Sequence, residues 1–335
     1  MRRRTFLGTA GGAVGAGIAG CLGPLDGDSA DASIRTIEVE SSISAAVFKW
    51  GLQRDLWADR GIDLSFETAP FNRYNRQIVE GEADIGAPST VAQLEFMDRG
   101  EPLTFVGPQQ NMFNRMFARA EADAIEAPTD LADRTLGLPA ALSSTTSIVH
   151  RVLVSDEYGF DLVEDTADTR AAEPPALWEF LQNGELDAIS QFSGFTIKGI
   201  ADDSVKTIFD PYELWFRRTE SGIPTTTFTV RPDWLSEHTS VVDDFLSGWA
   251  AALESFEENT RAALEEFGAD AGITEEADAE VVVELMDQGI AFGPARYDDA
   301  LVEAHWEFFE LLADADAVGL GDRDATFTTA DELRD

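Results

Sequence analysis

Apolar and polar positions follow two alternating patterns along the first third of the chain. An apolar residue at every second position predicts strands at 34–40, 62–67, 83–87 and 102–106. Between them, apolar residues three or four positions apart predict helices, each followed by a glycine, at 45–60, 71–80 and 89–99. This exchange of strand and helix predicts a parallel or mixed α/β sheet with right-handed crossovers.

The same order of elements returns later in the chain, which predicts two similar α/β lobes. In the second lobe, strands are expected at 135–138, up to 172, at 187–190 and at 205–209, with helices at 143–159 and 174–184. A strand at 225–230 and helices at 241–267, 275–288 and 297–312 follow. If these helices pack on the first lobe, the chain crosses between the lobes twice, and two crossings form a hinge.

One helix-to-strand junction occurs in both lobes. Gly81-Glu82-Ala83-Asp84-Ile85-Gly86 is echoed by Gly184-Glu185-Leu186-Asp187-Ala188. In each copy the glycine can take the left-handed conformation that ends a helix, and a polar loop follows the strand. In an open parallel sheet, such loops at the carboxyl ends of strands are where small ligands bind. The sequence therefore predicts a ligand cleft between the lobes.

The candidate ligand-binding residues stand in these loops or at their edges. They are Ser42, Ser44, Arg73, Tyr74, Ser89 and Thr90 in the first lobe, and Ser144, Thr145, Thr146, Phe192, Ser193 and Trp215 in the second. Hydroxyl groups at helix starts favour a bound anion, although any helix uses such residues as N-caps. An arginine can grip an anion in a bidentate fork, although on an acidic chain it more often bridges surface carboxylates. The aromatic residues can stack on an organic ligand.

The N-terminus has the chemistry of an export signal. Three arginines at positions 2–4 precede a run of small and apolar residues that ends in Ile18-Ala19-Gly20-Cys21. Residues 1–20 resemble a twin-arginine signal peptide with a lipobox, in which Cys21 becomes the lipidated first residue. A short membrane anchor is the alternative, but the run is short and rich in glycine. Residues 22–33 are small and polar, and they predict a flexible tether.

The composition adds an acidic surface and excludes some chemistry. Asp and Glu number 63 against 24 Lys and Arg, so the formal net charge is −39. These acids are spread along the chain and lysine is scarce, a pattern that resembles proteins of extreme halophiles. No basic stripe is present to neutralise phosphates, which argues against nucleic-acid binding. Cys21 is the single cysteine, so thiol catalysis and disulfides in the mature protein are excluded.

Taken together, these motifs resemble a known family: the solute-binding lipoproteins of ABC importers for nitrate, sulfonates, taurine and thiamine precursors. The resemblance rests on the two junctions above, on Ile62-Asp63-Leu64 behind Gly61, on Gly100-Glu101-Pro102-Leu103, and on Asp130-Leu131 with Thr135-Leu136-Gly137. It implies an α/β, two-lobed periplasmic-binding-protein fold of type II with a double-crossing hinge. Lobe I is then 34–116 plus 222–335, and lobe II is 117–221.

The resemblance also implies a function and partners. It implies an extracytoplasmic monomer, lipid-anchored to the outer face of the membrane, that captures a small anion of the sulfonate, taurine or nitrate class. An ABC permease and its ATPase are the expected partners, and no cofactor or metal is expected. A thiamine pyrimidine precursor is the alternative ligand. An enzyme of the same fold and a sensory lipoprotein are rival functions, although His150, His238 and His305 are far apart in the sequence.

Overall fold

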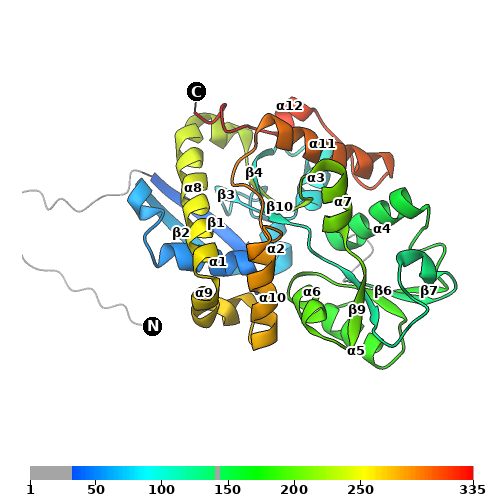
Figure 1. The fold of residues 1–335 in the computed structure, drawn as a ribbon. Coiled ribbons are helices and arrows are strands. Elements are labelled where there is room, and N and C mark those ends of the chain that lie inside the picture. Colours follow the sequence, from blue (N-terminus) through cyan, green and yellow to red (C-terminus); the bar gives the residue numbers. More distant parts are fainter. Residues whose placement is uncertain (1–31, 140–143, 335) are drawn as a thin grey trace, which may run out of the picture.

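The computed structural model describes residues 32–139 and 144–334, which form two α/β lobes side by side (Figure 1). The first lobe holds two groups of strands: β1 (Ala32–Val39) with β2 (Ile62–Ala69), and β10 (Pro224–Val230) between β3 (Ile85–Gly86) and β4 (Thr104–Asn111). Asp84 N–H donates a hydrogen bond to Arg35 O at 2.9 Å, so the chain entering β3 lies beside β1. The two groups therefore continue one layer.

The sheet of the second lobe has five strands in the order β7, β6, β8, β5 and β9. Their bounds are β5 Met116–Arg119, β6 Thr135–Pro139, β7 Asp168–Ala172, β8 Ala188–Ser190 and β9 Val205–Phe209. Strand β6 runs parallel to β7 and β8, whereas β5 is antiparallel to β8 and β9. The strands of this sheet come from one continuous stretch of chain, while those of the first lobe come from both sides of it.

Parallel pairing brings loops of the first lobe to one edge. All eight residues of β1 pair in register with β2, from Ala32 opposite Ile62 to Val39 opposite Ala69. The loops after these strands therefore begin side by side. They lead directly into α1 (Ile43–Leu52) and α2 (Phe71–Arg76), while α3 (Thr90–Asp98) follows β3. The amino ends of these helices consequently lie near the carboxyl ends of the strands.

The C-terminal helices follow β10. They are α8 (Pro232–Glu258), α9 (Thr260–Phe267), α10 (Glu276–Asp287), α11 (Asp299–Asp314) and α12 (Arg323–Thr326). Of these, α8 and α9 pack on α1 of the first lobe. Trp57 is buried between α1 and α8, and its indole N–H donates to Phe245 O at 3.1 Å. Gly51 and Gly248 leave room for this ring, because a Cβ at either position would come within 2.7 Å of it.

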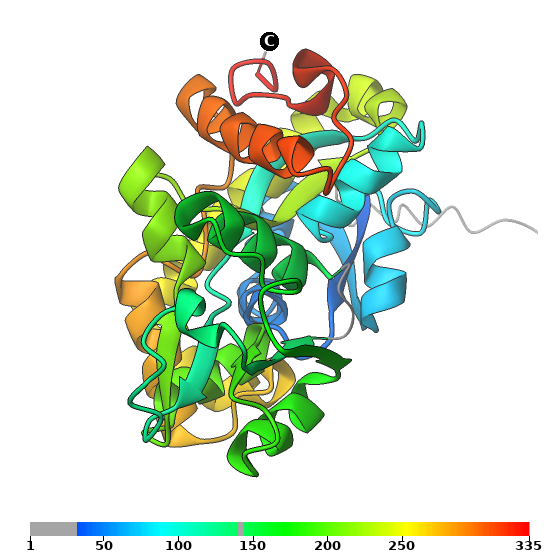
Figure 2. The ribbon, with the colours of Figure 1, turned by 90° about the vertical axis from the view of Figure 1, so that its right-hand side faces the viewer.

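Packed helices join the lobes at both ends of their interface. The second lobe contributes α4 (Thr145–Tyr158), α5 (Pro174–Gln182), α6 (Ser193–Ala201) and α7 (Pro211–Thr219). Trp215 of α7 packs on Phe308 of α11, which lies along the top of the molecule above α4 and α7 (Figure 2). At the opposite end α6 lies against α10, and Ile197 joins the apolar cluster of the first lobe. The lobes therefore touch at both ends of their interface.

The structure corrects several predicted elements. Strand β4 continues to Asn111, and the following segment, which has no clear period in the sequence, contains strand β5. Helix α7 begins at Pro211 and was not predicted. A short helical stretch from Pro232 precedes the predicted helix 241–267 and is set off from it by non-helical backbone angles at His238. The predicted helix divides at Asn259, which also has non-helical angles. Gly268 has a right-handed φ of −60°, so the helix does not end there through a left-handed glycine.

The left-handed glycines that were predicted are present at both echoed junctions. Gly81 has φ +69° and Gly184 has φ +73°. In the part of the chain that the structure describes, no helix has the length and apolar character needed to cross a membrane.

Candidate functional site

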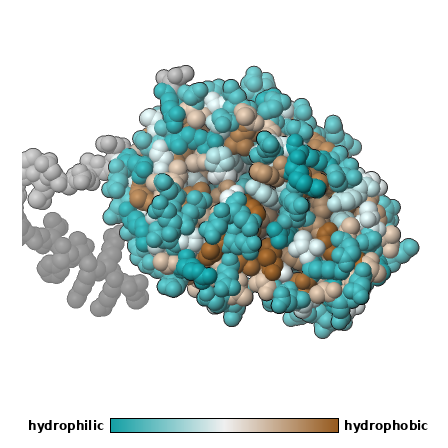
Figure 3. Space-filling model, viewed as in Figure 1, coloured by the Kyte–Doolittle hydropathy of each residue, from teal (hydrophilic) through white to brown (hydrophobic). Residues whose placement is uncertain are grey.

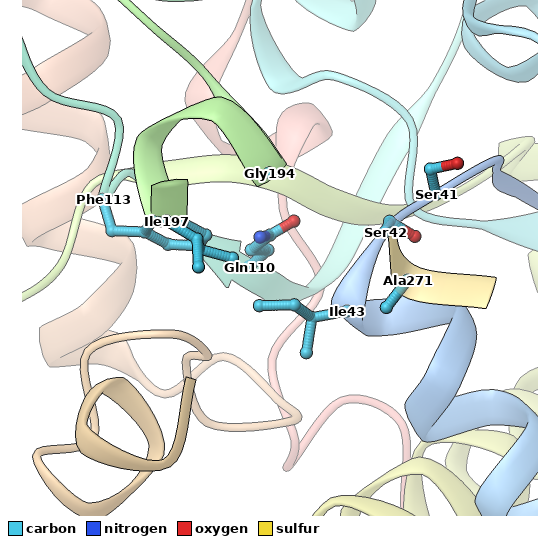
Figure 4. Close-up of a pocket in the computed structure, with 8 residues that line it drawn as sticks. All are labelled: Ser41, Ser42, Ile43, Gln110, Phe113, Gly194, Ile197 and Ala271. Carbon is cyan, nitrogen blue, oxygen red and sulfur yellow. The ribbon is translucent and has the colours of Figure 1, made fainter. Parts of the chain in front are cut away.

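A small cavity lies between the lobes, where the strand-end loops of both sheets meet. It is lined by Ser41, Ser42, Ile43, Gln110, Phe113, Gly194, Ile197 and Ala271 (Figure 4). The first three follow β1, Gln110 and Phe113 lie in and just after β4, and Gly194 and Ile197 belong to α6 of the second lobe. Its volume of about 10 Å³ is close to what one water molecule needs. Both lobes and a crossing strand thus form its wall.

The surface around this region is mostly hydrophilic. Figure 3 shows polar residues over most of the face seen in Figure 1, with several apolar residues near the middle, where the lobes meet. The cavity wall itself contains hydroxyl, amide and apolar groups and no charged side chain.

The loop after β1 presents two linked serines. Ser42 is the N-cap of α1: its Oγ accepts from Ala45 N–H at 3.1 Å and its hydroxyl donates to Val39 O at 3.0 Å. Ser44 Oγ in turn donates to Ser42 Oγ at 3.0 Å. Ser42 lies in the cavity wall, and Ser44 lies behind it with 1% of its surface exposed. Ser42 therefore lines the cavity, and Ser44 contacts it from behind.

The amino ends of α3 and α4 meet across the lobes. Ser89 Oγ and Thr145 Oγ1 are 2.5 Å apart, although the two residues belong to different sheets' loops. Ser144 caps α4 through Ser147 N–H, and Thr146 Oγ1 accepts from Asn114 Nδ2 at 2.8 Å. Thr90 Oγ1 is hydrogen-bonded to Thr227 Oγ1 at 2.7 Å. Each hydroxyl thus has its own partner, and Ser89 with Thr145 directly bridges the lobes.

Other candidates lie apart from the cavity wall. Arg73 is exposed and pairs with Glu67 and Glu82, both at 2.6 Å, which is the surface arrangement expected on an acidic chain. Trp215 is 1% exposed and packs edge-on against Phe308 at 5.3 Å, because α7 buries its apolar face beneath α11. The structure thus places Trp215 in the core. Phe192 precedes α6 and is half-buried, and Ser193 is the first residue of that helix.

Tyr74 points inward to a buried carboxyl group that the sequence analysis missed. The Tyr74 hydroxyl donates to Ala87 O and lies within hydrogen-bonding reach of Glu38. Glu38 is 1% exposed; its carboxyl accepts from Val39 N–H at 2.8 Å and from Gln109 Nε2 at 2.9 Å. Burial raises the pKa of Glu38 to about 7, and these hydrogen bonds only partly oppose that shift.

A signal for Glu38 was present in the sequence. Ile34, Thr36 and Glu38 share one face of a strand with a period of two, and Ile34 is a core residue. An acid on the core face of a strand is unusual enough to mark a candidate site. The cavity residues Gln110, Phe113 and Ile197 carried no such local signal.

The second lobe contains a buried histidine with two fixed partners. His150 Nε2 lies 3.0 Å from Asn114 O, and Nδ1 lies 2.8 Å from Ser190 Oγ. Burial lowers the pKa of His150 to about 4, so the ring is neutral. The carbonyl requires the proton on Nε2, so Nδ1 accepts from Ser190. Within the described ranges, no group of three or more His, Cys, Asp or Glu side chains is arranged to hold a metal ion.

The predicted signal peptide, Cys21 and the tether 22–33 lie outside the described residues, apart from the tether's last two positions, which begin β1. Residue 143, at which the predicted helix 143–159 begins, also lies outside them.

Solved structures with a similar fold include two sulfonate-binding proteins. The periplasmic aliphatic sulphonate binding protein SsuA from Escherichia coli superposes with a TM-score of 0.66 at 13% identity, covering 85% of this chain and 88% of that one. The alkanesulfonate-binding protein SsuA from Xanthomonas axonopodis pv. citri, bound to MOPS, gives 0.64 at 14% identity, covering 88% and 98%. A Candida albicans protein with the generic periplasmic binding protein fold gives 0.64 at 14%, covering 89% and 96%.

These likenesses show that the chain has the two-lobed α/β fold of periplasmic binding proteins. None of the curated proteins compared with this chain matches it. A family model described as "NMT1/THI5 like" matches residues 46–263, which span well over half of the chain and reach into both lobes. The chain belongs to the NMT1/THI5-like family.

Proposed function

We propose that the protein captures a small solute between its lobes and delivers it to an ABC permease. One observation carries the proposal: the cavity wall is built jointly by the loop after β1, the end of β4 and the start of α6. At about 10 Å³ the cavity has room for one water molecule in the arrangement described, so a solute enters when the lobes part. Once bound, it touches both lobes and favours their closure. Two of the similar structures are named as sulfonate-binding proteins, which supports the same role.

A small organic or inorganic anion is the ligand class that we propose, with sulfonates, taurine and nitrate as its members. The amino ends of α1, α3, α4 and α6 lie at the loops that face the cleft. Helix amino ends carry partial positive charge and free N–H groups, which favour an anion even without a basic side chain. The apolar residues Ile43, Phe113 and Ile197 in the wall suit a ligand with a short organic body.

A thermal-shift screen tests this function. Nitrate, methanesulfonate, taurine and an aminopyrimidine are each added to the protein in concentrated potassium chloride. We expect an anion of this set to raise the melting temperature, because a ligand that binds the folded state stabilises it. Gln110→Ala, in the cavity wall, should reduce that shift, while the matched variant Gln288→Ala, on an exposed helix end, should keep it. If no solute raises the melting temperature, the proposed function is wrong.

We also propose that the mature protein is an extracytoplasmic lipoprotein, exported by the twin-arginine route and anchored through Cys21. The support is the sequence Ile18-Ala19-Gly20-Cys21 behind three arginines. Cys21→Ser should release the protein from the membrane fraction, and the cleaved lipid-modified form should vanish from mass spectra. A variant that stays membrane-bound with the same processed mass contradicts the lipid anchor.

A further inference from the structure

A carboxyl group lies directly behind the wall of the cavity. Glu38 is the penultimate residue of β1, which leads into the segment that contributes Ser41, Ser42 and Ile43 to the wall. Gln109, which donates to Glu38 at 2.9 Å, is the chain neighbour of Gln110 in the wall. Glu38 is therefore one layer of residues away from the space proposed for the ligand.

No positive charge compensates this carboxyl group. The groups that face it are Ser44 from α1, Tyr74 from α2 and Gln109 from β4, together with the N–H of Val39. Of these side chains, Tyr74 is the one that titrates, and its pKa is raised well above the usual range by burial and then by Glu38. Among the described residues, no Lys, Arg or His forms an ion pair with Glu38. A negative charge here is consequently held by neutral donors alone, which is costly in a buried place.

The amide of Gln109 has a fixed orientation. Thr226 Oγ1 donates to Gln109 Oε1 at 2.8 Å, so the amide nitrogen must face Glu38. Gln109 lies on β4 and Thr226 on β10, the strands at which the chain leaves and re-enters the first lobe. The carboxyl group is thus tied to both crossing strands.

Two hydroxyls connect Glu38 to the cleft loops. The Ser44 hydroxyl donates to Ser42 Oγ, and the Tyr74 hydroxyl donates to Ala87 O, two residues before Ser89. A neutral carboxyl can donate to one of these hydroxyls and leave both hydroxyl protons on their cleft partners. A charged carboxylate instead accepts hydroxyl protons and draws them away from Ser42 and Ala87. The protonation of Glu38 thereby reaches the loops after β1 and β3.

We propose that the protonation state of Glu38 determines which ligand charge the protein accepts, and that capture of an anionic solute is coupled to the uptake of one proton by Glu38. This inference rests on the proposed function. A charged Glu38 would repel an anionic ligand across the water-poor wall. A neutral Glu38 removes this repulsion and keeps Ser42 and Ala87 in their places. The proton comes from solvent on binding and returns to solvent on release.

Calorimetric titration tests the coupling. Methanesulfonate and nitrate are titrated into the full protein from about pH 6 to about pH 9, in two buffers whose ionisation enthalpies differ. We expect uptake to approach one proton at the alkaline end, and affinity to fall about tenfold for each pH unit above about 7. Glu38→Gln should bind the anion without uptake and with nearly constant affinity. Glu82→Gln, which removes a surface charge of the same lobe, should behave like the wild type.

The wild-type measurement decides the question even if Glu38→Gln does not fold. Binding of methanesulfonate or nitrate without proton uptake at any pH overturns the proposal, as does an unchanged pH dependence in folded Glu38→Gln. If an aminopyrimidine or an amine binds and both anions fail at every pH, solute capture stands and the anion-coupled role of Glu38 is wrong. If no solute binds, the proposed function fails and this inference fails with it.

Discussion

Glu38 shows how a single buried residue makes the stability of this protein depend on pH. Its pKa is about 7 in the folded protein against an ordinary value of 4.5, because burial penalises the charged form. The folded state therefore holds its proton more tightly than the unfolded state. The stabilisation from this group is complete below about pH 4.5 and is lost as the pH rises through about 7.

Replacing Glu38 by Gln should remove this pH dependence. We expect the free energy of unfolding of the wild type, relative to Glu38→Gln, to fall by roughly 2 to 3 kcal/mol between about pH 5 and about pH 8. Denaturant unfolding of both proteins in the same concentrated salt measures the difference. A difference that stays constant over this range, or that grows with pH, contradicts a protonated Glu38 in the folded state.

Arg73, unlike the buried and unpaired Glu38, is an exposed residue whose charge is paired. The fork geometry that suits an anion is used on two surface carboxylates, Glu67 and Glu82. All three side chains are well exposed, so solvent screens these pairs and they contribute little to stability. Residue type alone did not show whether the arginine binds a ligand or pairs with surface carboxylates. The excess of acids in the chain favoured the surface pair.

At the scale of elements, the predictable features are those with local causes. Gly61, Gly81, Gly159 and Gly184 all have positive φ next to a helix or a turn, and the fold needs glycine there for local steric reasons. Most strand and helix positions follow from the periodicity of apolar residues, which is also a local property of the sequence. The antiparallel direction of β10 between β3 and β4 has no local cause, because it depends on partners more than 100 residues away.

The residues of the candidate site also divide into those whose position has a local cause and those whose position depends on distant parts of the chain. Ser42, Ser44, Ser89 and Thr145 stand where a strand gives way to a helix, and the sequence places them at the cleft through that rule alone. Glu38 depends on Gln109, 71 positions further on, and the cavity residue Ile197 depends on how the second lobe docks. Trp215 was misplaced because helix α7, which buries it, was not predicted.

A test of the element packing is available at Gly107 in β4. A Cβ at this position would lie 2.1 Å from Ala295 O, so the segment between α10 and α11 can rest on β4 because a side chain is absent. Gly107→Ala should destabilise the protein by about 1 to 3 kcal/mol, since backbone must move to relieve the overlap. Gly321→Ala is the matched control, because no atom lies within 4 Å of its added Cβ. Equal melting temperatures for the two variants would show that the segment does not pack as described.

At the scale of the whole molecule, the negative net charge is the dominant feature. The excess of acids leaves many carboxylates next to other carboxylates. The pKa of Glu257 is raised by burial and by repulsion from Glu254, and the pKa of Asp278 is raised by burial and by repulsion from Glu275. The lobes themselves are closed by apolar contacts such as Trp215 on Phe308, which salt does not weaken.

We therefore predict that the protein loses stability when salt is removed. The Debye length is about 3 Å in 1 M salt and about 10 Å in 0.1 M salt, so dilution extends repulsion among the excess acids of a chain with net charge −39. The melting temperature should fall markedly between concentrated and dilute potassium chloride. A protein that keeps its melting temperature in dilute salt contradicts the interpretation of a halophilic surface.

A pair of variants separates charge repulsion from a general effect of salt on hydrophobic packing. Glu254→Gln with Glu275→Gln removes two repelling partners and should reduce the loss of melting temperature in dilute salt. Glu276→Gln is the matched control, because Glu276 pairs with Arg261 at 2.8 Å and its loss removes an attraction instead. If both variants respond to salt as the wild type does, packing and not surface charge sets the salt dependence of this fold.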